Sequence, residues 1–124
     1  MNNTMYKYAC LEVYSILKQY NLEGYFSLLE KKIIYKVIED LKMLVSKNPA
    51  IKNFDIAIFN HLGFKSILNY RVANSLQLIN NDFLELFSLK ISEDCKLLTG
   101  VEIHPLANIE GGGSYRSCDR NCYW

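Results

Sequence analysis

Few residues of this chain combine the types and spacing that chemistry requires. The 124 residues include four cysteines and two histidines. Three residues separate Cys118 from Cys122, but a tetrahedral zinc site needs two more ligands and no histidine lies near them. We therefore expect no metal site. Cys10 and Cys95 lie within apolar helical patterns, where a reduced thiol packs as a small hydrophobic group.

The histidine His61 lacks the neighbours that would activate it. A histidine becomes a general base when a carboxylate orients it and a nucleophile lies within reach. Neither a carboxylate nor a cysteine stands beside His61 at a spacing that suggests a pair. We interpret it as a structural residue.

The elements that must position any site are predicted to be helices. Apolar residues recur at helical spacing in four segments, namely 5–20, 25–45, 64–79 and 83–98. Pro49 must stop the second helix, Asp82 is expected to cap the fourth and Gly100 to end it. The pattern predicts a mainly α chain, with a helical bundle over residues 1–100.

Composition excludes several functional classes. Half of the residues are hydrophobic and the formal net charge is +1, with basic and acidic residues interspersed. A chain of this kind folds around a core and offers no basic surface to a nucleic acid. No apolar run is long enough to cross a bilayer, and the polar N-terminus does not resemble a signal peptide. We expect a cytoplasmic protein without nucleic-acid or membrane partners.

The residue pattern changes at Val101. Ile103 and Ile109 head two successive six-residue units with small residues later in each, which is typical of hexapeptide β-helices. Such coils are stable only when they stack, and about three or more repeats are needed. Residues 101–112 are therefore predicted to be the first turns of a left-handed parallel β-helix that stops soon after it begins.

The order of these features resembles the serine acetyltransferase family. Members have a helical N-terminal domain, an Asp-Pro-Ala turn, a Gly-Phe helix with Tyr-Arg, and Val-Asp-Ile-His-Pro opening a left-handed β-helix. The matching segments here are Asn48-Pro49-Ala50, Gly63-Phe64, Tyr70-Arg71-Val72-Ala73 and Val101-Glu102-Ile103-His104-Pro105. The resemblance covers residues 46–112, and the first helices are similar in kind only.

The resemblance implies acetyl transfer from acetyl-CoA to L-serine, which makes O-acetylserine for cysteine biosynthesis. Acetyl-CoA is a co-substrate, and no cofactor is expected in this chain. Glu102 falls at the position of the aspartate that orients the catalytic histidine. Asn48, followed by Pro49, falls at the serine-binding aspartate, and its amide cannot supply a charge for the substrate's ammonium group. The resemblance implies a structural role for His104, because the family's catalytic base comes later in the sequence, in an Asp-His-x-Thr-Gly motif.

Residues 113–124 have neither hexapeptide rhythm nor apolar alternation, and we expect a loose tail from about Gly111. One permitted back-translation from Gly113, read one base later, gives Val-Leu-Ile-Asp-His-Val-Thr-Gly-Thr-Val-Ile-Gly-Glu, which contains the missing motif. Glu110 and the three glycines after it can be encoded by an uninterrupted guanine tract, on which polymerases slip. We therefore interpret the tail as the product of a frameshift, and we expect the chain to be inactive alone because it lacks the catalytic histidine.

Two alternatives remain open from the sequence. The chain would be the off-state of a phase-variable enzyme of the same family that acetylates a sugar hydroxyl of a polysaccharide, which would suit Asn48. Alternatively, the helical domain would persist as an interaction module, since in the family this region joins subunits into larger assemblies. Both the family reading and the module predict a homo-oligomer formed through the helical domain.

Overall fold

Four α-helices form most of the chain in the computed structural model, which describes residues 3–47, 62–109 and 115–117. These helices are α1 (Asn3–Gln19), α2 (Phe26–Lys47), α4 (Leu62–Gln77) and α5 (Asp82–Thr99), with a 3-10 turn η1 (Glu23–Tyr25) before α2. The prediction of a mainly helical chain is confirmed.

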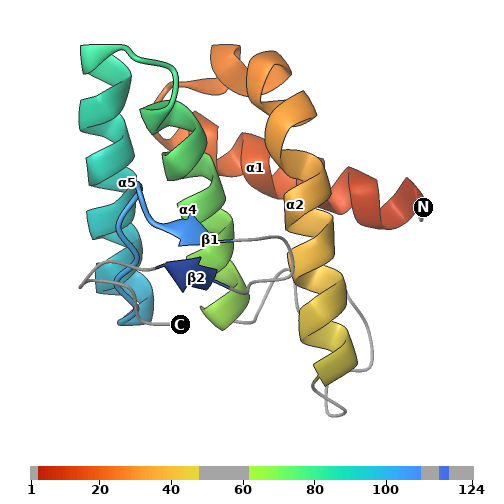
Figure 1. The fold of residues 1–124 in the computed structure, drawn as a ribbon. Coiled ribbons are helices and arrows are strands. Elements are labelled where there is room, and N and C mark those ends of the chain that lie inside the picture. Colours follow the sequence, from red (N-terminus) through yellow and green to blue (C-terminus); the bar gives the residue numbers. More distant parts are fainter. Residues whose placement is uncertain (1–2, 48–61, 110–114, 118–124) are drawn as a thin grey trace.

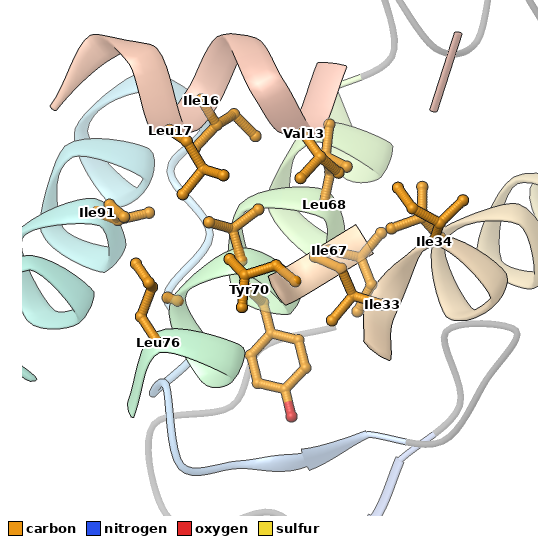
Figure 2. Packing of buried hydrophobic residues seen from close by; sticks show 14 of the residues in the cluster. Val13, Ile16, Leu17, Ile33, Ile34, Ile67, Leu68, Tyr70, Leu76 and Ile91 are labelled. Carbon is orange, nitrogen blue, oxygen red and sulfur yellow. The ribbon is translucent and has the colours of Figure 1, made fainter. Parts of the chain in front are cut away.

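Helix α4 lies at the centre of the bundle, where it contacts α1, α2 and α5 (Figure 1). Its residues Phe64, Ile67 and Leu68 are almost fully buried. Figure 2 shows apolar side chains of the other three helices converging on it, among them Leu17, Ile34 and Ile91. A helix that is covered on several sides cannot have a single apolar stripe, so most residues of α4 are buried, while α2 keeps one polar face.

Polar residues define the helix ends. Asn21 and Asn80 adopt left-handed backbone conformations, which asparagine tolerates better than most residues. The cap of α5 is Asn81, whose side chain accepts a hydrogen bond from the Leu84 amide at 3.1 Å, so the prediction that Asp82 caps this helix is wrong by one residue. Gly100, with φ of 76°, ends α5 as predicted.

Two leucines that fit the apolar periodicity do not reach the core. Leu78 is 68% exposed because α4 ends at Gln77, before the predicted limit, and Leu11 is 52% exposed on α1. The start of α4 also differs from the prediction, since Gly63 lies within its first turn and does not precede it. The residues that position the site are unaffected by these changes.

The segment after α5 crosses the bundle and ends in a short strand. Strand β1 (Asn108–Ile109) pairs in antiparallel fashion with β2 (Tyr115–Ser117). The expectation of a loose tail from Gly111 is therefore wrong for residues 115–117, whose backbone finds partners on the otherwise open edge of β1. Stacked β-helix coils pair in parallel. This antiparallel pair therefore does not confirm the predicted coil, and the start of a β-helix stays a prediction.

None of the helices that the structure describes is long and apolar enough to cross a membrane.

Candidate functional site

The residues that the sequence singled out divide into two groups. Asn48, Pro49, His61, Cys118 and Cys122 lie outside the described residues. Glu102 and His104 lie in the segment that leaves α5 and crosses α4. That segment, residues 101–109, is therefore where the structure bears on the predicted site.

Glu102 lies beside the C-terminal turn of α5. Its carboxylate oxygen Oε2 is 3.4 Å from Nζ of Lys96, and its side chain is about one-third exposed. An ion pair so close to solvent contributes little to stability. Glu102 is thus held by a weak contact near the surface.

His104 stabilises the turn that it begins. Its ring atom Nδ1 accepts a hydrogen bond from the Leu106 amide at 3.1 Å, and its carbonyl accepts one from the Ala107 amide at 2.9 Å. An imidazole that accepts at Nδ1 carries its proton on Nε2 and fixes the local backbone. This geometry fits the predicted structural role.

Four alternate carbonyls of this segment accept hydrogen bonds from side chains of α4 and α5. Ser92 Oγ donates to the Ile103 carbonyl at 3.0 Å, and Asn74 Nδ2 donates to the Pro105 carbonyl at 2.7 Å. Further along, the Tyr70 hydroxyl donates to Ala107, and Arg71 donates to Ile109 at 2.7 Å. We call these four donors (Ser92, Asn74, Tyr70 and Arg71) the carbonyl clamp.

The side chains at the same alternate positions point into the protein. Ile103, Ala107 and Ile109 are at most 7% exposed, whereas Leu106 is 58% exposed and Asn108 is exposed as well. These three buried residues are the two heads and one small residue of the predicted six-residue units. The clamp fixes the path of residues 103–109 across the bundle, and the burial fixes which of their side chains face the core.

The charged donor of the clamp, Arg71, is anchored by a buried ion pair. Arg71 Nε and Nη2 each lie 2.9 Å from a different carboxylate oxygen of Asp40 on α2, and both side chains are at most 3% exposed. This bidentate geometry orients the guanidinium so that its third nitrogen, Nη1, meets the Ile109 carbonyl. The pair thus couples α2, α4 and the segment that follows α5.

Sequence reasoning missed the Asp40–Arg71 pair, although a signal was present. Asp40 lies one turn from Val37 and Leu44 and next to Leu41, within the apolar stripe of α2. A carboxylate on a buried face requires a charged or hydrogen-bonding partner. Its position on the stripe predicts that a partner exists, but only the tertiary structure identifies Arg71.

Replacing Tyr70 with phenylalanine tests the clamp. The hydroxyl lies in a buried site, and burial raises its pKa, so at neutral pH it donates its proton to the Ala107 carbonyl. We expect Tyr70→Phe to lower the free energy of unfolding by about 1 kcal/mol and to speed amide exchange around residue 107. Tyr35→Phe is the control, since Tyr35 is 58% exposed. Equal urea midpoints for the two variants would contradict the role of Tyr70.

Nucleophilic chemistry is not favoured at the two described thiols. Burial raises the pKa of Cys95, and burial together with the nearby Glu30 carboxylate raises that of Cys10. Both groups therefore stay protonated at neutral pH, and a thiol is a poor nucleophile. Within residues 3–47, 62–109 and 115–117, no three His, Cys, Asp or Glu residues gather to form a metal site.

An open groove of about 280 Å³ lies between α1, α4 and α5. Glu12 and Lys65 line it, as do Tyr20 and Asp94, whose hydroxyl and carboxylate are joined by a 2.7 Å hydrogen bond. Burial raises the pKa of Glu12, and the charge of Lys65 opposes that rise. Within this groove the Tyr20 hydroxyl and the Asp94 carboxylate are therefore engaged with each other.

No protein-family model, curated protein or solved structure gives a significant match to the chain. Its function is therefore inferred from its residues and contacts.

Proposed function

We propose that this chain is the helical domain and β-helix entrance of a serine acetyltransferase-like protein, and that alone it does not transfer acetyl groups. One observation carries the proposal: the Tyr-Arg segment binds residues that follow shortly after the Val-Glu-Ile-His-Pro segment. Tyr70 and Arg71, of the Tyr-Arg segment, bind the carbonyls of Ala107 and Ile109, just after Ile103-His104-Pro105. These hydrogen bonds would anchor the first turn of a β-helix to the helical domain that precedes it.

The burial pattern of the segment supports the same proposal. In a hexapeptide coil the aliphatic head and a later small residue point inward. Ile103, Ala107 and Ile109 hold those positions and are buried, while Leu106 and Asn108 between them face solvent. The segment therefore has the inward and outward alternation that a first coil requires.

Acetyl transfer needs a base that this sequence does not supply. In the proposed reaction the base takes the proton of the acceptor hydroxyl, the oxygen attacks the acetyl carbonyl carbon of acetyl-CoA, and the CoA thiolate leaves. The sequence holds two histidines, and neither follows an aspartate nor precedes x-Thr-Gly. The carboxylate of Glu102 lies 3.4 Å from the ammonium group of Lys96. To orient the missing imidazole, Glu102 would have to break this ion pair.

We further propose that the codons of residues 113–124 carry the missing base in another reading frame. The shifted translation contains Asp-His-Val-Thr-Gly followed by Val-Ile-Gly-Glu, the order that the family shows. Synonymous codons leave freedom at several positions, so the nucleotide sequence decides whether this frame exists.

The acceptor is the second point that an experiment must decide. Serine carries an ammonium group that a carboxylate binds well, whereas a sugar hydroxyl needs no such charge. Asn48 is neutral, which favours a sugar acceptor over serine if this position contacts the substrate. L-serine remains the first proposal because the remaining motifs are those of serine acetyltransferases.

A frame-restored protein tests both acceptors. CoA release would be followed with L-serine and, in parallel, with a panel of sugars, for the restored protein and for the same protein with Asn48→Asp. The serine proposal expects turnover with L-serine, improved by Asn48→Asp. Turnover with a sugar but not with L-serine would favour the alternative, a sugar acceptor. If neither L-serine nor any sugar caused release of CoA, acetyl transfer would be refuted.

A further inference from the structure

One exposed stripe on α5 is not explained by the proposed reaction. Leu86 and Leu97 are 68% and 85% exposed, and between them lie the exposed side chains of Lys90 and Glu93. The spacing of four, three and four residues places all four on one narrow line along the helix. The buried residues Leu84, Ser88, Ile91 and Cys95 lie on the opposite face, against the rest of the bundle.

The surroundings of the stripe are also apolar. Phe83 is 55% exposed and Leu89 is 40% exposed, and helical geometry places them on either side of the stripe. Helix α5 lies at the edge of the bundle in Figure 1, with α4 packed along one side of it. Large apolar side chains that gather on one exposed face are typical of an interaction surface.

The order of charges in the stripe selects one kind of partner. We infer that the stripe binds the same stripe of a second copy of this chain, with the two α5 helices antiparallel about a two-fold axis. If the axis passes between Ile91 and Ser92, Leu86 meets Leu97 of the second copy, and Lys90 meets its Glu93. Two-fold symmetry repeats both contacts, which gives two leucine pairs and two ion pairs.

Other arrangements of two α5 helices are less favourable. A parallel pair places Lys90 against Lys90 and Glu93 against Glu93, and an antiparallel pair shifted by one turn creates one of these like-charge contacts. The ion pair between Lys90 and Asp94 within one helix, at 3.5 Å, does not compete strongly, because an ammonium group has three donors. The charges therefore define a single register.

This interface is small, so the expected dimer is weak. Two leucine pairs flanked by Phe83 and Leu89 form a contact in the class below about 1,200 Å², which is typical of transient pairs. The inference does not rest on acetyl transfer, because it uses only the surface of α5. An inactive frame-restored protein would leave it unchanged.

Charge exchange in the purified chain tests the register. Lys90→Glu and Glu93→Lys each turn both ion pairs into like-charge pairs, whereas the double variant restores them in exchanged order. We expect self-association in sedimentation equilibrium to weaken about tenfold or more in each single variant and to recover in the double variant. Lys42→Glu and Glu39→Lys, both on exposed positions of α2, are matched controls.

Circular dichroism of every variant would show that the helices are intact, since all the changed side chains are exposed. A wild-type dimer with the pattern above supports the inference. A wild-type monomer, including one whose stripe is covered by another part of the chain, overturns it, as does a trimer. Single variants that behave like the α2 controls, or a double variant that does not recover, also overturn it.

Discussion

Replacing Asp40 with alanine is expected to lower the free energy of unfolding by about 3–5 kcal/mol. The substitution leaves the Arg71 guanidinium in a site where its side chain is only 3% exposed, without the carboxylate that binds two of its nitrogens. Removing one member of a buried pair costs more than the pair contributes, because the remaining charge stays desolvated and loses its countercharge. Urea denaturation followed by circular dichroism measures the change.

The adjacent residue provides the control for this experiment. Glu39 is exposed on the polar side of α2, and Glu39→Ala is expected to change stability by less than about 0.5 kcal/mol. The double variant Asp40→Leu/Arg71→Met removes both charges and should be more stable than Asp40→Ala alone, although the Ile109 carbonyl loses its donor. If Asp40→Ala unfolds at the same urea concentration as Glu39→Ala, the pair does not join α2 to the clamp.

Restoring the reading frame is expected to produce the largest change of all. The chain as it stands should release CoA from acetyl-CoA no faster than the uncatalysed reaction, with or without L-serine. A protein whose frame continues through Asp-His-Val-Thr-Gly should accelerate release by about 10⁶-fold or more, as enzymes commonly do. Spectrophotometric detection of the free thiol measures both rates under the same conditions.

Two variants of the restored protein separate catalysis from folding. Replacing the histidine of the restored motif with asparagine should abolish turnover, because the acceptor hydroxyl loses its base. Glu102→Gln should lower kcat while leaving the fold intact, since the amide holds an imidazole less well than a carboxylate and Glu102 makes only a weak surface ion pair. Appreciable turnover by the chain without the restored motif would contradict the requirement for that histidine.

The helices were predictable because their signals are local. Apolar spacing alone identified α2, and the burial of Ile33, Val37 and Leu41 follows from it directly. Helix ends depend on smaller energies, and the cap of α5 moved from Asp82 to Asn81 because both are good capping residues and lie next to each other. Leu78 fitted the periodicity yet is exposed, because the helix stops before it.

The clamp was not predictable from local patterns. Periodicity placed Tyr70 only on the apolar side of a helix, and the resemblance gave no partner for Tyr70 or Arg71. Their hydrogen bonds reach 37 and 38 residues along the chain. Ser92 and Asn74 carried no signal, because a single serine or asparagine on a helix is common at the surface. Contacts between residues so far apart depend on how the helices pack, which periodicity does not determine. Asn48, a central residue of the predicted site, lies outside the residues that the structure describes.

The nucleotide sequence of the gene from the codon for Glu110 onward tests the central claim most directly. We expect the frame shifted by one base to read Asp-His-x-Thr-Gly at the codons of residues 116–120 and to continue into further six-residue repeats with aliphatic heads. That result would place the catalytic histidine of a serine acetyltransferase-like enzyme a few residues after the clamped segment in the sequence. A shifted frame that encodes neither the motif nor the repeats would contradict the claim, and the chain would then be a helical domain without a catalytic continuation in that frame.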